Sequence, residues 1–331
     1  MDKKFDQDRD AKLSVIRDEL GKKYPLLKIP TKSYLVLMSP RSGSTLLCAH
    51  LEKIGFGRPT EGFNISIRAL KERFGNNVDF SNSYAHIVAA INYGMNNGIF
   101  GLKLSWIQFE SFIRKARDLI GDNENILRDV DLFDIFFPDT KLIRLKRRNK
   151  VKQAVSFSKA MQTGIWNERV DASDDYKEYV LPPHYNQDHI EALFDNLLAF
   201  DLSWEYFLRS NHKECFEVWY EDLAKDYVNT MTRICDFLGV KNNQEMEPPL
   251  KQQSDEISQQ WVERFQKQTE WLHDPVISQG LEEGDFNTVF FHRSVLMARK
   301  HERQVWSKLP YHKNKTLKRY IYRAKKRLGL K

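Results

Sequence analysis

A stretch crowded with hydrogen-bond donors lies between two apolar segments near the start of the chain. It reads SYLVLMSPRSGSTLL and runs from residue 33 to residue 47. The apolar residues before it are typical of a short buried strand, and those after it are typical of a helix. A strand that turns sharply into a helix presents N–H groups that have no partner within the helix and lie at the positive end of its dipole. Such a turn is suited to a phosphate or sulfate group.

The side chains of this loop are also suited to an anion. Gly43 lets the backbone approach closely, Arg41 adds a permanent charge, and Ser42, Ser44 and Thr45 add hydroxyl donors. Plain capping of a helix needs one hydroxyl and no arginine, so capping alone explains the stretch less well. For Arg41 the alternative is a surface salt bridge.

A second segment, RRNKVKQAVS, begins where a strand expected over 140–147 ends. Arg148 stands at the end of that strand, and Ser156 follows eight residues later in a predicted helix. The pair can converge on a second phosphate, although Ser156 could instead bond to the backbone of its own helix. Two separated phosphate sites indicate a nucleotide phosphorylated at both its 5′ and 3′ positions.

The loop differs from the phosphate loop of nucleoside triphosphatases, which reads GxxxxGK[ST] and works with magnesium. Here a single glycine is present, an arginine stands two residues before it, and the strand 140–147 continues into LKRRN without an aspartate. These differences argue against a nucleotide or sugar kinase, which stays the alternative function. We also expect no metal, because Cys48, Cys215 and Cys235 lack CxxC spacing.

The elements that must position these groups alternate along the chain. We expect strands at 34–38, 98–106, 140–147 and 215–223, and helices at 44–54, 149–164, 189–208 and 227–240. This alternation predicts an α/β fold whose central, mainly parallel sheet is flanked by helices. The expected organisation is an N-terminal helical extension (1–32), one domain (33–272) and a C-terminal extension (273–331).

The positive charge of the chain is concentrated at its end. The net charge is +7, but residues 313–331 hold nine Lys and Arg and no acid, so the remainder is close to neutral. The body is therefore not expected to bind nucleic acid specifically. The tail has the spacing of a basic amphipathic helix and predicts peripheral contact with an anionic membrane, the alternatives being a solubilising tail or non-specific nucleic-acid contact. Without a signal peptide or membrane span, a cytoplasmic protein is expected.

Taken together, these pieces resemble the PAPS-dependent sulfotransferase superfamily and, within it, the bacterial trehalose 2-sulfotransferase family (PAPS is 3′-phosphoadenosine-5′-phosphosulfate). The similar stretches are SYLVLMSPRSGSTLL, GRPTEGFN, GLKLSW, QAVSFSKAMQTGIW and QQSDEISQQWVERF, which occur in the family's order over about residues 33–272. The resemblance implies a P-loop-like sulfotransferase fold. It also implies sulfuryl transfer from PAPS, with PAP as product and no metal, to a hydroxyl of a carbohydrate or glycolipid, and a homodimer.

The resemblance also assigns roles to residues. The loop from Arg41 to Thr45 would hold the 5′-phosphosulfate, while Arg148 and Ser156 would hold the 3′-phosphate. Glu61, in GRPTEGFN, matches the glutamate that removes the acceptor proton in the trehalose family, its alternative being a solvated loop residue. Other bases that the sequence offers are His50, His86, His184 and His189.

Three more residues are candidates for the site. Lys103, in the apolar strand GLKLSW, would face the leaving group or Glu61, unless it reaches past the strand end to water. Trp106 and Trp166 could stack on a sugar, and their alternative is a place in the core. Gln252 stands where the family has an arginine, which leaves open a degenerate protein that binds PAP or glycan without turnover. Gly-Phe-Asn follows Glu61 where two aromatic residues are usual, which affects the acceptor pocket.

Overall fold

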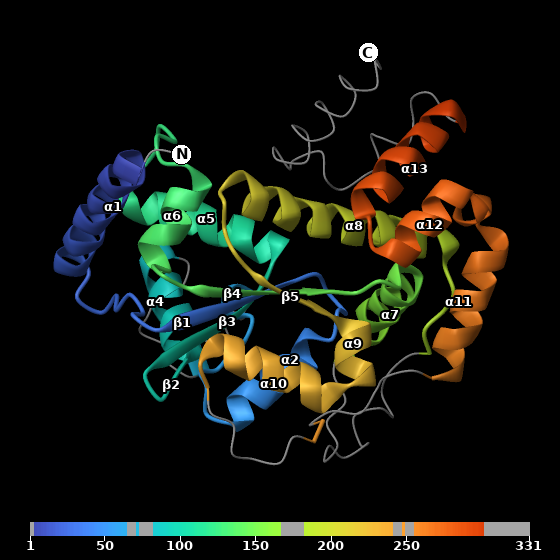
Figure 1. Ribbon diagram of the computed structural model, residues 1–331, viewed down its shortest axis with the longest axis horizontal. Coiled ribbons are helices and arrows are strands. Elements are labelled where there is room, and N and C mark those ends of the chain that lie inside the picture. The colour runs from blue at the N-terminus through green and yellow to red at the C-terminus, as the bar shows by residue number, and fades with distance from the viewer. Residues whose placement is uncertain are drawn as a thin grey trace.

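A five-stranded sheet forms the centre of the computed structural model, which describes residues 3–64, 71–72, 82–166, 182–240, 247–248 and 255–300 (Figure 1). The strands are β1 (Ser33–Met38), β2 (Met95–Asn96), β3 (Ile99–Ser105), β4 (Lys141–Lys146) and β5 (Phe216–Trp219). Their order is β2-β3-β1-β4-β5; β2 pairs antiparallel with β3, and the other pairings are parallel. The expected α/β fold with a mainly parallel central sheet is confirmed.

Helices cover both faces of this sheet (Figure 1). They are α1 (Lys3–Lys23), α2 (Ser44–Lys53), α4 (Ser83–Gly94), α5 (Trp106–Ile120), α6 (Asp129–Phe136), α7 (Lys150–Thr163), α8 (Gln187–Ser210), α9 (Tyr220–Lys225), α10 (Tyr227–Leu238), α11 (Glu256–Gln268), α12 (Pro275–Glu283) and α13 (Phe286–Lys300). Two short 3-10 turns are η1 (Gly62–Asn64) and η3 (Glu270–His273).

The central strand β1 is buried along its whole length, and its side chains alternate between two hydrophobic cores. Leu35 and Leu37 belong to the larger core, which also holds apolar residues of α5 and α8. Tyr34 and Val36 belong to the smaller core, with apolar residues of α2 and α10. The alternation follows from the two-residue period of a strand, so β1 holds both layers together.

The order of the strands reverses at β1. From β1 the chain next adds β3 on one side of it and later β4 on the other side. In open α/β sheets, ligands bind at such a reversal of strand order. The segments after β1, β3, β4 and β5 lie at this edge, and they include the loop 39–43 and the start of α7.

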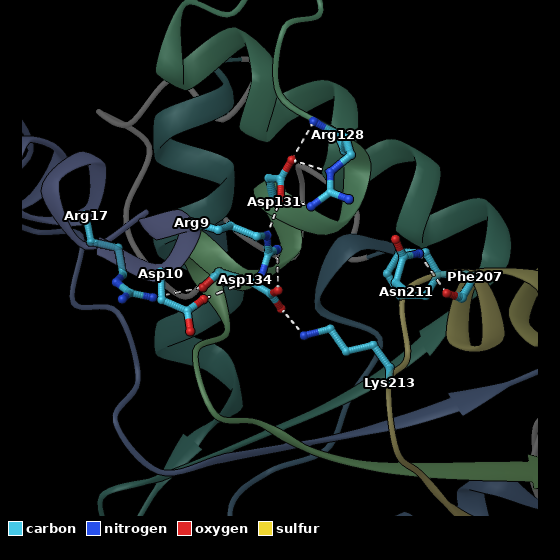
Figure 2. A network of polar contacts seen from close by, with 9 residues as sticks. All are labelled: Arg9, Asp10, Arg17, Arg128, Asp131, Asp134, Phe207, Asn211 and Lys213. Carbon is cyan, nitrogen blue, oxygen red and sulfur yellow. Dashed lines mark hydrogen bonds and ion pairs between the residues drawn. The ribbon is translucent and has the colours of Figure 1, made fainter. Parts of the chain in front are cut away.

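The N-terminal helix α1 is attached to α6 by a network of charges (Figure 2). Arg9 donates at 2.7 Å to Asp131 and at 2.7 Å to Asp134. Lys213, which follows α8, lies 2.5 Å from the second carboxylate, and Arg128 lies 2.9 Å from the first. Arg9, Arg128 and Lys213 therefore each face a carboxylate of the same chain, while Arg17 donates to the Asp134 carbonyl.

Both terminal helical regions pack into the larger core, through Leu13 and Leu20 of α1, Ile277 of α12 and Phe286, Val289 and Phe290 of α13. Arg293 of α13 is buried and pairs with Asp195 at 2.6 Å and Glu191 at 2.7 Å on α8. The turn between α12 and α13 lies against Trp219 so closely that a Cβ on Gly284 would be 2.6 Å from its ring. These helices thus support the end of β5.

Within the described ranges, no helix is both long and apolar enough to cross a bilayer. Two features singled out in the sequence, Gln252 and the basic tail 313–331, lie outside the described residues.

Candidate functional site

The loop after β1 has the tight backbone that its sequence predicts. Gly43 precedes α2 with φ of 84°, and Arg41 also has a positive φ of 63°. A Cβ on Gly43 would lie 2.3 Å from the ring of Tyr220, so both the conformation and the space require glycine there. The ring of Tyr220 therefore fixes how closely the loop approaches the segment after β5.

Ser42 is fully buried at the base of this loop. Its side-chain oxygen has no hydrogen-bond partner among the described residues. Leaving a buried hydroxyl unsatisfied costs about 1–3 kcal/mol, and it is exceptional enough to need a reason. A bound anion at the positive end of α2 would supply the missing partner.

Arg41 and Arg147 form a cationic pair beside the loop. Arg41 donates from Nε to the Ser156 hydroxyl at 2.9 Å and from Nη1 to the Trp166 carbonyl. Burial, and then the nearby charge of Arg147, lowers the pKa of Arg41 to about 10. The sequence paired Ser156 with Arg148, whereas in this structure its hydroxyl accepts from Arg41 of the loop.

Arg147 is a residue of this site that sequence reasoning missed. Its Nη1 donates to the Arg41 carbonyl at 3.0 Å, and its guanidinium lies over the Tyr220 ring at 4.6 Å. Its Nε is buried and has no hydrogen-bond partner in the part of the chain that is described. Burial lowers the pKa of Arg147 despite the opposing effect of Tyr220 and Glu221. The basic pair at 147–148 was visible in the sequence, but which member is buried was not.

Arg148 points to another partner in this structure. It forms a two-pronged contact with Asp222, at 2.9 and 3.2 Å, and lies over the Trp219 ring at 4.6 Å. The Asp222 hydrogen bond raises the pKa of Arg148 and outweighs burial. The Ser156 hydroxyl accepts a hydrogen bond from Arg41 instead. Arg148 and Ser156, which were expected to bind one phosphate together, therefore have separate partners in this structure.

A buried polar chain connects the loop to α8. Gln153 of α7 donates to Ser39 Oγ at 3.0 Å and to the Pro40 carbonyl at 2.7 Å. Its own oxygen accepts from Lys150 Nζ at 2.8 Å, and Lys150 pairs with Asp201 at 2.5 Å. Because these groups are buried and satisfied, they specify one position for the start of the loop.

Glu61 and Lys103 meet at the other side of the loop. Lys103 Nζ lies 2.9 Å from Glu61 Oε1 and donates to Thr45 Oγ1 at 3.3 Å. Glu61 Oε2 accepts from Gln108 Nε2 at 2.6 Å and from Asn64 Nδ2 at 3.1 Å. Burial alone would raise the pKa of Glu61, but Lys103 and these hydrogen bonds lower it. The carboxylate is therefore ionised at neutral pH.

The two tryptophans have different surroundings. Trp106 is only 3% exposed and packs against Phe109, Trp204 and Phe207, so it lies in the core and we assign it no sugar contact. It is the first residue of α5, directly after β3, and two of these three rings come from α8. Trp166 is 44% exposed, and its carbonyl accepts from Arg41, so it stays a candidate for the acceptor.

The histidines proposed as other bases lie elsewhere or in packed surroundings. His50 is buried and bonded to the Tyr227 hydroxyl at 2.9 Å. His189 contacts Ser158 at 3.1 Å, and the backbone N–H of His184 donates to Gln162. His86 is buried with its ring stacked on Phe63. Among the described residues, no cluster of His, Cys, Asp and Glu is arranged to hold a metal ion.

Comparisons with known proteins show the family of the chain. A family model described as Stf0 sulphotransferase matches residues 33–268. A protein of Mycolicibacterium smegmatis named trehalose 2-sulfotransferase is 28% identical over 259 residues, which cover 71% of this chain and 94% of that protein. One of the same name from Mycobacterium tuberculosis is 24% identical over 268 residues, covering 74% and 98%. A solved sulfotransferase domain from the Synechococcus PCC 7002 olefin synthase is 19% identical, covering 72% of this chain and 95% of that one. Its TM-score of 0.30 is too low for a comparison of the folds.

Proposed function

Because the chain belongs to the Stf0 sulphotransferase family, we propose that it moves a sulfuryl group from PAPS to a hydroxyl of a carbohydrate or glycolipid. The observation that supports this best is one lysine shared by an anion loop and a carboxylate. Lys103 contacts Thr45 in the loop at 3.3 Å and Glu61 at 2.9 Å. Transfer of an anionic group to a hydroxyl needs such an anion site and a proton acceptor side by side.

The loop is suited to the donor. The buried Ser42 hydroxyl lacks a partner in the described structure, Gly43 allows the tight turn before α2, and Arg41 and Arg147 supply positive charge. When bound, PAPS would supply a sulfuryl group attached to a phosphate leaving group. Arg41 and the N–H groups from Gly43 to Thr45 would bind its 5′-phosphosulfate.

The 3′-phosphate would be bound by Arg148 and Ser156. Arg148 would have to exchange Asp222 for the phosphate, which is a short movement for a side chain that is 35% exposed. Such an exchange trades one charge-assisted hydrogen-bonded pair for another. The affinity for a 3′-phosphate would then depend on how much more strongly Arg148 binds the phosphate than it binds Asp222.

The reacting groups divide their roles by charge. Arg41 and Lys103 would stabilise the negative charge that grows on the leaving phosphate, since fixed cations aimed at developing charge lower the barrier. Glu61 would accept the proton of the acceptor hydroxyl. Its lowered pKa keeps it ionised and ready over the whole neutral range.

The acceptor is proposed to be a sugar, because both matched relatives are named trehalose 2-sulfotransferase. Trp166, exposed and joined to Arg41 through its carbonyl, could stack on one face of that sugar. A radiolabelled-sulfate transfer screen, with trehalose, other sugars, glycolipids and a cell extract as acceptors, tests this. A protein that binds PAP but labels none of them would be a binding protein and not a transferase.

Donor binding is tested by calorimetry with PAP and with adenosine 5′-phosphate, each with magnesium and with EDTA. We expect tighter binding of PAP, and no effect of EDTA. Equal affinity for the two nucleotides would contradict the 3′-phosphate site. Binding that requires magnesium and favours ATP would indicate a kinase.

The proposal extends to the place and assembly of the protein. It places a homodimer in the cytoplasm, with the tail 313–331 touching anionic membrane lipids, each basic residue near the surface contributing about 1 kcal/mol. Sedimentation with anionic and neutral vesicles, with and without the tail, tests the contact, and light scattering tests the dimer. A full-length protein that stays in the supernatant with anionic vesicles at low salt would contradict the membrane contact.

A further inference from the structure

The two oxygens of Glu61 have different partners. Oε1 accepts from Lys103 Nζ at 2.9 Å, while Oε2 accepts from Gln108 at 2.6 Å and from Asn64 at 3.1 Å. The lysine also reaches Thr45 of the anion loop. An anion in that loop would attract Lys103 and leave Oε1 with fewer bonds, whereas Oε2 would keep both of its amide partners.

The orientation of Gln108 is fixed by its place on α5. It is 6% exposed and stands three residues after the N-cap Ser105. Its Oε1 accepts from the Ser105 backbone N–H at 3.2 Å, so the amino group must face Glu61. The same amide thus caps a helix with one atom and holds the carboxylate with another.

We propose that Gln108 is a positioning residue that, with Asn64, holds Oε2 of Glu61 so that Oε1 is the oxygen that receives the acceptor proton. This inference rests on the proposed function. In the step, the acceptor hydroxyl gives its proton to Oε1 while its oxygen bonds to sulfur. The bond between sulfur and the phosphate oxygen breaks, and its electron pair stays on the phosphate.

The other groups around Glu61 leave this assignment intact. From β3, Lys103 supplies the positive charge. From α2, Cys48 stays a neutral thiol, because burial raises its pKa to about 12. From α4, His86 lies against Phe63 of the same turn as Asn64. Gln108 is therefore the neutral donor on Oε2 whose replacement can change the charge there without changing shape.

The discriminating variant is Gln108→Glu. It keeps an oxygen for the Ser105 N–H, so the start of α5 stays capped, but it sets a second carboxylate against Oε2. Two facing carboxylates share a proton, and the pair ionises fully only at higher pH. The acidic limb of the pH–rate profile should therefore move upward by about one unit or more, with turnover partly restored at alkaline pH. If Gln108 only capped the helix, Gln108→Glu would leave the acidic limb of the profile unchanged.

The profiles of kcat and kcat/KM are measured with trehalose, or with the acceptor that the transfer screen identifies. Gln259→Glu is the matched control, because Gln259 donates to Glu263 at 3.1 Å on the exposed surface of α11. The control should leave the profile unchanged. Gln108→Met, which removes both amide atoms, should lower kcat roughly 10-fold or more with unchanged affinity for PAP. A Gln108→Glu profile that overlays the wild type would overturn the inference.

A second measurement needs no acceptor. In the wild type, the lowered pKa of Glu61 adds stability that is present above its unfolded value and lost as pH falls. In Gln108→Glu, the shared proton makes the loss of stability small at pH 4.5 and larger at pH 7.5. Urea unfolding at both pH values should show this rise, while a loss that is the same at both would contradict it.

The two proposals can fail separately. If Glu61→Gln keeps near wild-type turnover, the base assignment fails and the inference falls with it. If Glu61→Gln is inactive while Gln108→Glu behaves like the wild type, only the role of Gln108 is wrong.

Discussion

Two regions of the molecule contain neighbouring arginines, and their surroundings shift the pKa of these arginines in opposite directions. In the network between α1 and α6, Arg9 faces Asp131 and Asp134 (Figure 2). Burial alone would lower the pKa of Arg9, but the hydrogen bonds that it donates to these carboxylates raise it. Arg41, in the loop after β1, and Arg147, which follows β4, donate to a hydroxyl and to carbonyl oxygens, and the pKa of each is lowered.

On the proposed function, the difference separates charge that holds the fold from charge that would bind the donor. A network of matched ion pairs gains nothing from an added anion, whereas two neighbouring guanidiniums that repel each other do. Arginines with lowered pKa values at the reversal of strand order are therefore candidates for function, and arginines matched to carboxylates are candidates for holding the fold. Four experiments test this distinction, in order of their expected effect on turnover or nucleotide binding.

The Glu61–Lys103 pair is the hardest case for the comparison, because it is matched and yet assigned to the reaction. Glu61→Gln keeps its size and removes the proton acceptor. We expect turnover to fall by about 10²-fold or more, with PAP affinity changed only a few-fold. Transfer assays and calorimetry measure the two. A variant with near wild-type turnover would exclude Glu61 and return attention to His86.

Arg147→Gln removes one of the two repelling cations. Because hydrogen bonds to charged groups are worth about 1.5–3 kcal/mol, PAP should bind roughly 10-fold or more weakly. The free energy of unfolding should change little, since relief of repulsion offsets the lost contact with the Tyr220 ring. Calorimetry and urea unfolding check both. Unchanged PAP affinity with a large loss of stability would make Arg147 a structural residue.

Arg148 belongs to both classes of arginine, since it is paired with Asp222 but is proposed to bind a 3′-phosphate. Arg148→Ala should remove most of the preference for PAP over adenosine 5′-phosphate, which is about 10-fold if one charged hydrogen bond is lost. Asp222→Asn should do the reverse and tighten PAP binding a few-fold, because it frees the guanidinium. Competition binding of the two nucleotides measures the preference. Tightening by both variants would contradict the assignment.

Arg9→Gln should leave PAP binding and turnover unchanged. It should lower the free energy of unfolding by about 1–3 kcal/mol, because Asp131 and Asp134 each lose a charged hydrogen bond. The pKa of Asp131 is lowered, since Arg128 and Arg9 outweigh burial, so its stabilising effect is lost as pH falls below about 4. The difference between variant and wild type in urea unfolding should shrink at pH 3. A difference independent of pH would contradict this role.

The sequence predicted the fold, and the candidate residues that it named lie where short-range patterns place them. The strands, the glycine turn before α2 and the position of Glu61 depend on residues close together in the chain. The packing of Trp106 could not be predicted in this way, because the rings that enclose it come largely from α8, which is distant in the sequence. Which of Arg147 and Arg148 is buried likewise depends on Tyr220 and Asp222, more than 70 residues later.

Two further features were beyond local reasoning or were overlooked. Arg9 meets Asp131 across 122 positions of sequence, and no spacing rule indicates such a pair. Gln108, in contrast, had a recognisable pattern, since Ser105 followed three residues later by glutamine is a capping box. The pattern predicts the helix start, but contact with Glu61 needs the turn η1 to be placed against α5.

The contact of the α12–α13 turn with Trp219 has a consequence for protein engineering. A shortened enzyme cut to the family match at residues 33–268 would lack both this turn and α1. It would expose the buried faces on which Leu13, Ile277 and Val289 now pack, each worth about 1.5–3 kcal/mol. It would also uncover the Trp219 ring, over which Arg148 and Lys146 lie. A minimal enzyme of this type should therefore be cut no earlier than the end of α13, at residue 300.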